Sequence, residues 1–155
     1  MKRVGINLSE VKYHVIDVAA YCLSKNEMNC FKLQKILYYI QAAFIVKKRR
    51  PCYIGKIVKA EFGPIIPTIE NIYSIFGNRI ISLDESELIG DASLIESEDR
   101  ELIDLVCKRC EVMSGNDLSI ATHLDAPWNA ASDNGVITCK SIFDFYINNE
   151  LRLMI

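Results

Sequence analysis

The clearest pattern in the chain is a long segment, between Asn29 and Pro51, whose apolar residues recur every three or four positions. Asn29 is a favoured residue at a helix N-cap, and Pro51 prevents a helix from continuing. The run Lys-Lys-Arg-Arg at 47–50 complements the negative end of a helix dipole. The spacing therefore predicts one long helix at the centre of the core, whose buried face consists of Phe31, Leu33, Ile36, Leu37, Ile40 and Phe44.

Shorter segments with the same spacing predict five more helices. The first follows Ser9, its expected cap, and two others cover residues 67–77 and 97–115. A short helix over residues 118–124 and a last helix capped by Thr138 complete the set. The expected buried stripe of the first helix consists of Val11, Val15, Val18, Ala19 and Cys22.

The remaining segments predict a small amount of β structure. Residues 52–61 alternate loosely and predict a short strand or hairpin arm, whereas the Gly-Pro-Ile-Ile-Pro sequence at 63–67 predicts a turn. Residues 79–83 predict a second strand, and we expect the acidic segment 84–96 to be loosely ordered. The sequence thus predicts a mainly α, single compact helical domain over 1–155, with about six helices and a two- or three-stranded β element.

Composition supports this fold class and predicts a compartment. Half of the 155 residues are hydrophobic and a quarter are charged, as in soluble globular proteins. No apolar run approaches the length that spans a bilayer, and no secretory signal is recognised after Met1, Lys2 and Arg3. We therefore expect a cytoplasmic protein without a membrane partner.

The net charge of −2 hides an uneven distribution. Residues 1–60 carry twelve Lys and Arg against three acidic residues, whereas residues 61–155 carry six basic and seventeen acidic residues. Two interpretations stay open: the two segments face each other within one domain, or they form separate surfaces for two partners.

Six cysteines raise the question of disulfides or a zinc site. In a reducing cytosol we expect free thiols. Cys107 and Cys110 have the spacing of a metal-ligand pair, but the sequence has no second such pair, and only His14 or His123 would complete a site through the fold. We expect no metal and no cofactor, with the metal question open for Cys107 and Cys110.

Three segments stand out through their residues and their order. Residues 32–39 read Lys-Leu-Gln-Lys-Ile-Leu-Tyr-Tyr, with Gln41 beyond, and the Gly-Pro segment at 63–67 is followed by Tyr73. Residues 118–128 contain Leu-Ser, Thr-His, Asp and Pro-Trp in that order. Together these segments resemble the Panacea domain of the SocA-like antitoxins, a phage-associated family found in bacterial toxin–antitoxin loci and prophages. The resemblance covers most of the chain.

The resemblance implies a function. It implies a protein that neutralises a separately encoded cognate toxin by direct binding, and in one mode an adaptor that delivers the toxin to an ATP-dependent protease. The chain departs from the family at Ala60, where Trp is frequent, and at Phe62, where His or Tyr is common. These departures bear on any partner contact made there.

The expected partner contacts are polar or aromatic residues of the three segments. His123 precedes Asp125, but no nucleophile stands in a recognisable relation to it, so we expect a hydrogen-bonded histidine that positions the Pro-Trp turn. Packing of the final helices competes with partner binding as the role of Trp128. The candidate partner contacts are Lys32, Gln34, Lys35, Tyr39, His123 and Trp128. The residues expected to shape the backbone are Gly63, Pro64 and Pro127.

Three classes of function are compared. The leading one is a binding module, an antitoxin whose partner is a toxin protein, with no catalytic residues and no cofactor. One alternative is a nucleic-acid-binding regulator that uses the basic first third, although no helix-turn-helix signature is evident; another is a prophage-encoded interaction protein without a toxin partner. A cysteine hydrolase is the nearest enzyme class, and we expect no enzyme.

Overall fold

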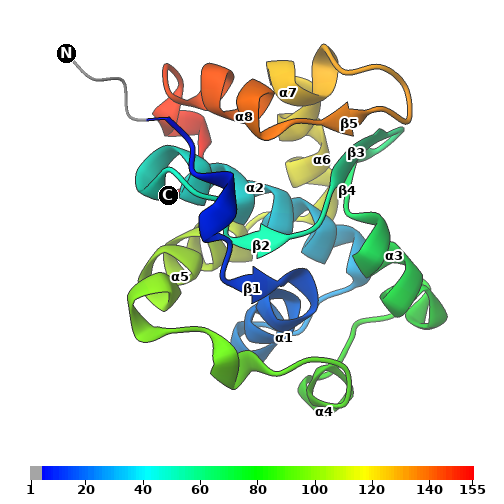
Figure 1. Ribbon diagram of the computed structural model, residues 1–155. Coiled ribbons are helices and arrows are strands. Elements are labelled where there is room, and N and C mark those ends of the chain that lie inside the picture. Colours follow the sequence, from blue (N-terminus) through cyan, green and yellow to red (C-terminus); the bar gives the residue numbers. More distant parts are fainter. Residues whose placement is uncertain (1–4) are drawn as a thin grey trace.

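The computed structural model describes residues 5–155; Lys2 and Arg3 of the basic segment lie outside the described residues. Helix α2 (Cys30–Lys48) runs through the middle of the fold and contacts α1, α3, α5, α6 and α8 (Figure 1). The Asn29 side chain accepts a hydrogen bond from the backbone N–H of Lys32, and Arg49 ends the helix in the left-handed conformation. The predicted long central helix and its cap are therefore confirmed.

Residues 5–155 form eight α-helices, which confirms a mainly α fold with more helices than the six expected. The helices other than α2 are α1 (Val15–Lys25), α3 (Pro67–Tyr73), α4 (Leu83–Glu87), α5 (Ser97–Glu111), α6 (Gly115–His123), α7 (Ala126–Asn129) and α8 (Cys139–Tyr146). Short 3-10 helices cover Leu8–Glu10, Ser74–Phe76, Ala92–Leu94 and Glu150–Arg152.

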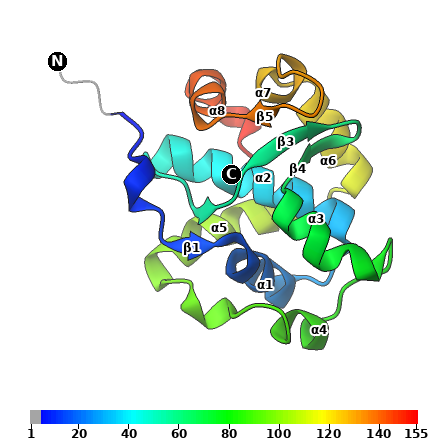
Figure 2. The same cartoon turned by 45° about the vertical axis from the view of Figure 1, so that its right-hand side comes forward.

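The β structure consists of two small sheets. Strands β1 (Tyr13–His14) and β2 (Tyr53–Ile54) pair in parallel. Strand β3 (Ile57–Ala60) lies between β4 (Gly63–Ile65) and β5 (Val136–Ile137) and is antiparallel to both. Figure 2 shows the β3–β4 hairpin beside α2, with α3 and α6 close to it.

Strand pairing explains two corrections. Ser9 was expected to cap the first helix, but it lies in a 3-10 helix capped by Asn7, and α1 begins only at Val15 because β1 pairs with β2 first. The turn expected at 63–67 lies at Glu61 and Phe62 instead, since residues 63–65 pair with β3.

Local capping explains the other corrections. The strand expected at 79–83 is reduced to one bridge between Met28 and Ile81, because Ser82 and Glu85 form a capping box that starts α4. The segment 84–96 is accordingly helical in two places rather than loosely ordered. Gly115 was expected to end a helix but is the first residue of α6, which a Ser114 capping box begins.

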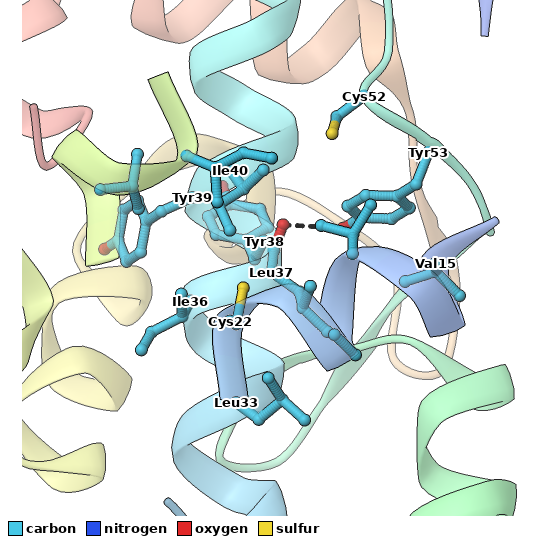
Figure 3. Packing of buried hydrophobic residues seen from close by; sticks show 14 of the residues in the cluster. Val15, Cys22, Leu33, Ile36, Leu37, Tyr38, Tyr39, Ile40, Cys52 and Tyr53 are labelled. Atoms are coloured by element: carbon cyan, nitrogen blue, oxygen red, sulfur yellow. Dashed lines mark hydrogen bonds between the residues drawn. The ribbon is translucent and has the colours of Figure 1, made fainter. Parts of the chain in front are cut away.

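The core forms around α2 and α1 (Figure 3). Leu33 and Leu37 of α2 are fully buried, as is Cys22 of α1. The Tyr53 hydroxyl donates a hydrogen bond of 2.8 Å to the carbonyl of Leu37, so β2 is tied directly to the central helix. Along α2 the buried residues lie on every side of the helix, which is typical of a helix enclosed by its neighbours.

Basic residues of the first segment form ion pairs with acidic residues of the second segment inside the domain. Six of the nine ion pairs among the described residues join a cation of residues 5–60 to a carboxylate of residues 61–155. The most buried carboxylate of these six is Asp99, which accepts hydrogen bonds of 2.6 Å from Tyr13, Lys48 and Arg50. The observed pairing favours the interpretation in which the two segments face each other. In the described part of the chain, no helix has both the length and the apolar character that crossing a membrane requires.

Candidate functional site

The three motif segments meet at Gly63, the first residue of β4. Its φ of +121° is one that side-chain-bearing residues rarely adopt. A Cβ at this position would lie 2.6 Å from Cε of Lys35 and 3.0 Å from Oγ1 of Thr122. A glycine therefore lets the hairpin approach α2 and α6 closely enough to cover the Lys35 side chain.

Two buried glutamines of α2 hold the neighbouring backbone in place. Gln34 accepts a hydrogen bond from the N–H of Ile66 at 2.8 Å and donates to its carbonyl at 3.3 Å. Seven residues later, Gln41 accepts from the N–H of Cys52 at 2.7 Å and donates to the carbonyl of Tyr53 at 3.0 Å. Each amide thus pairs with backbone groups as a neighbouring strand would, and together they fix both ends of the segment that forms the hairpin.

Lys35 is a buried cation without an ion pair among the described residues. It is 1% exposed, and its Nζ lies 4.4 Å from the centroid of the Phe31 ring. Burial lowers the pKa of Lys35 to about 8, although the nearby Cys30 and Glu70 act in the opposite direction. The ammonium group is therefore held in its charged form at neutral pH against the cost of desolvation.

A pocket of about 250 Å³ lies between α2 and α3 and includes Lys35 in its wall. Tyr73 also lines this pocket, and its buried hydroxyl has no hydrogen-bond partner among residues 5–155. The side chains of the wall that carry polar groups are Cys30, Gln34, Lys35, Glu70, Tyr73 and Asn78. The sequence motifs pointed to Gln34, Lys35 and Tyr73 but missed Glu70, which lies one helical turn before Tyr73 on the same helix.

A second hollow, of about 380 Å³, lies beside Trp128. The Trp128 indole donates a hydrogen bond of 2.9 Å to the carbonyl of Ala60, and Nζ of Lys59 lies 4.2 Å from the centroid of the indole ring. On this indole the ring of His123 stacks, with centroids 4.0 Å apart. We expected a hydrogen-bonded histidine, but His123 is held by stacking, and its buried Nε2 has no hydrogen-bond partner in the described residues.

Asp125 forms hydrogen bonds with Tyr146 and Arg152 and not with His123. It is fully buried, and it accepts hydrogen bonds from the Tyr146 hydroxyl at 2.7 Å and from the Arg152 guanidinium. Burial raises the pKa of Asp125, while the Tyr146 and Arg152 hydrogen bonds act against this rise. Tyr38 extends the network, because its hydroxyl lies 3.0 Å from that of Tyr146. The network therefore ties the C-terminal residues to α2, and the need of a buried tyrosine for a polar partner was its signal in the sequence.

The structure separates the six candidate contacts into groups. Gln34 and Lys35 lie in the pocket between α2 and α3, whereas His123 and Trp128 form the stack next to the hairpin. The other two candidates belong to neither hollow: Lys32 donates to a carbonyl of α5, and Tyr39 is fully buried with an unpaired hydroxyl in the described structure. A role in partner binding stays a prediction for all six.

The thiols are enclosed in the fold. All six cysteines are free, and five of them, including Cys107 and Cys110, are buried. Burial raises the pKa of Cys30 to about 11 and that of Cys110 to about 12. Within residues 5–155 no three His, Cys, Asp or Glu side chains are grouped so that they would hold a metal ion.

The protein is a small, mainly helical domain with a hollow between α2 and α3 and a second one beside Trp128. A family model, described as antitoxin SocA-like, Panacea domain, matches residues 33–129. The match covers more than half of the chain and contains all three motif segments except Lys32, so the protein belongs to the SocA-like antitoxin family. Membership supports a general role as an antitoxin, whose partner is a toxin. No curated protein and no solved structure matches the chain.

Proposed function

We propose that this protein neutralises a cognate toxin by binding it directly, without chemistry of its own. The observation that carries the proposal is the family match over residues 33–129. The matched segment contains most of the residues that line the two hollows. Outside it lie Cys30 and Phe31 of the first hollow and the residues beyond 129 of the second. A folded domain that inhibits another protein needs surface on which that protein packs, with aromatic and apolar side chains at its centre.

Such surface is present around the hairpin and α6. Phe62, at the tip of the β3–β4 hairpin, is 62% exposed, and its carbonyl accepts a hydrogen bond from Ser119 of α6. Ile120 of α6 and Leu124, the C-cap residue of this helix, are also exposed and lie four residues apart, hence on one side of the helix. We propose that these apolar residues and the partly exposed Trp128 pack against the toxin.

The enclosed thiols support a role without catalysis. A cysteine hydrolase needs a thiolate at neutral pH, and burial keeps the thiols of Cys30 and Cys110 protonated there. The basic first third also supports protein binding over nucleic-acid binding, since Lys12, Lys48 and Arg50 are engaged with carboxylates of the same chain.

Delivery of the toxin to a protease would require a second binding surface. The basic and acidic residues whose separation along the chain suggested two surfaces are largely engaged in ion pairs within the domain. We therefore propose that direct neutralisation is sufficient for rescue. Toxin half-life in cells separates the two modes: it stays unchanged under direct neutralisation and shortens when an ATP-dependent protease receives the toxin.

Co-expression with the product of the adjacent open reading frame tests the proposal. We expect that product to stop growth when expressed alone, and we expect this protein to restore growth and to co-purify with it. Leu124→Glu places a charge in the proposed contact and should abolish both effects, whereas Leu151→Glu, at a still more exposed leucine near the C-terminus, should leave them intact. Equal rescue by both variants would contradict the proposed contact surface.

A further inference from the structure

The pocket between α2 and α3 contains a buried cation, Lys35, that has no hydrogen-bond or ion-pair partner among residues 5–155. Lys35 brings three N–H donors to the pocket and is only 1% exposed. On the acceptor side, the Glu70 carboxylate already lies 3.4 Å from the Gln34 amide that donates to it. The carbonyl oxygen of the same amide is taken by the N–H of Ile66. Glu70 is the one carboxylate among the residues of this wall, and it forms no ion pair with Lys35, so the ammonium group has no paired acceptor among the described residues.

The Lys35 ammonium is held in the pocket by the packing of its own stem. Cε and Cδ of Lys35 lie against Gly63, at positions where a Cβ would be only 2.6 and 3.2 Å away. The Phe31 ring provides a favourable contact for the charge, but no counter-charge. Burial keeps the Cys30 thiol protonated at neutral pH, so this thiol provides none either.

We propose that the pocket receives an acidic side chain of the toxin, whose carboxylate pairs with the Lys35 ammonium. This inference rests on the proposed function, because it names the chemistry of the partner. A partner carboxylate brings a negative charge that pairs directly with Lys35 and several acceptor positions, and its hydrogen bonds to a cation are stronger than those between neutral groups. The exposed rim residues Ser74 and Asn78 leave the pocket open to a partner.

The size and charge of the pocket favour a single acidic side chain. About 250 Å³ is below the range of pockets that enclose drug-sized ligands, and it suits one side chain that enters from a partner surface. Glu70 opposes a ligand with several negative charges, since it lies in the same wall. Both features favour an aspartate or glutamate of a protein over a phosphate group.

Lys35→Met tests the inference in a binding assay with the product of the adjacent reading frame. Methionine keeps an unbranched apolar stem and removes the ammonium group. We expect binding to weaken by about thirty-fold or more, as for the loss of one partner of a buried charge pair. Lys47→Met, at an exposed lysine near the other end of the same helix, is the matched control and should leave the affinity unchanged. Wild-type affinity in Lys35→Met would overturn the inference and leave the proposed function intact.

A second arm identifies the carboxylate in the toxin. Each exposed Asp and Glu of the toxin is changed to Asn or Gln, and each variant is measured against wild-type protein and against Lys35→Met. One of these changes should weaken binding to the wild type and have no further effect on binding to Lys35→Met. The absence of such a coupled pair would overturn the inference.

A third arm keeps the inference testable if the adjacent product does not bind, a result that would contradict the proposed function itself. The probe is N-acetylglutamate N-methylamide, with the glutamine analogue as its neutral control. We expect saturable shifts of the Lys35 side-chain NMR signals with the glutamate probe alone, and none at Lys47, which lies outside the pocket. Identical responses to both probes, or no response, would overturn the inference.

Discussion

Lys35→Met should make the free protein more stable at neutral pH, although it removes a residue that we assign to binding. Burial lowers the pKa of Lys35 from its ordinary 10.5 to about 8. At about 1.4 kcal/mol per pH unit, this difference corresponds to a cost of about 3 kcal/mol for keeping the ammonium charged in the fold. Loss of the contact with Phe31 offsets about 0.5 to 2 kcal/mol of that gain. We therefore expect a net stabilisation of about 1 to 3 kcal/mol at pH 7.

The pH dependence of the stability difference between the two proteins distinguishes removal of a buried charge from better packing of methionine. Between about pH 8 and 10.5 the unfolded chain holds the Lys35 proton more tightly than the folded one, so a rise in pH stabilises the wild type relative to Lys35→Met. Urea denaturation of both proteins should show the advantage of Lys35→Met in full at pH 7 and almost lost by about pH 10.5. Buried tyrosines and cysteines titrate in the same range, but their effect is common to both proteins and cancels in the difference. A variant that is less stable than wild type at pH 7, or a difference that does not change with pH, would refute the reasoning.

Three further predictions concern stability. Gly63→Ala should destabilise the fold by about 2 kcal/mol or more in urea denaturation, because an alanine there has an unfavourable φ and its Cβ contacts Lys35 too closely. The control is Gly77→Ala, where φ is +57° but the space around the residue is open, and it should cost only about 1 kcal/mol. Gln41→Leu should cost about 2 to 4 kcal/mol in the same assay, because it leaves two buried backbone segments without partners, and a loss below about 1 kcal/mol would contradict that role. Burial acts to raise the pKa of Asp99, but hydrogen bonds from Lys48 and Tyr13 and the charge of Arg50 outweigh it and lower the pKa below 3.8. Asp99→Asn should therefore reduce the melting temperature near pH 7, and its deficit should shrink as the pH falls through the acid range, where wild-type Asp99 also takes up a proton; a deficit independent of pH would contradict this assignment.

Local signals made the central helix predictable. Asn29 and Pro51 mark its ends through interactions within a few residues, so its bounds follow from the sequence alone. The start of α1 depends instead on the pairing of Tyr13 with Tyr53, forty residues away. No local pattern around Ser9 contains that information, which explains why its role as a cap was mispredicted.

Burial of polar residues on α2 was the part of the site that sequence patterns did not reveal. Gln34 and Lys35 were predicted as contacts because polar groups on an apolar helix are expected to face solvent or a partner. The structure encloses Gln34 because the backbone of Ile66 needs hydrogen bonds, and it encloses Lys35 because Gly63 allows the hairpin to approach. Both causes lie in segments that become neighbours only through the fold. The pocket, and the acidic partner that it suggests, therefore depend on the tertiary structure.

The most direct test of direct neutralisation is a calorimetric titration of the purified product of the adjacent reading frame into this protein, paired with growth rescue by the same two proteins. We expect a one-to-one complex, and we expect Leu124→Glu to lose the complex and the rescue together. Restored growth without a measurable complex between the purified proteins would contradict the account.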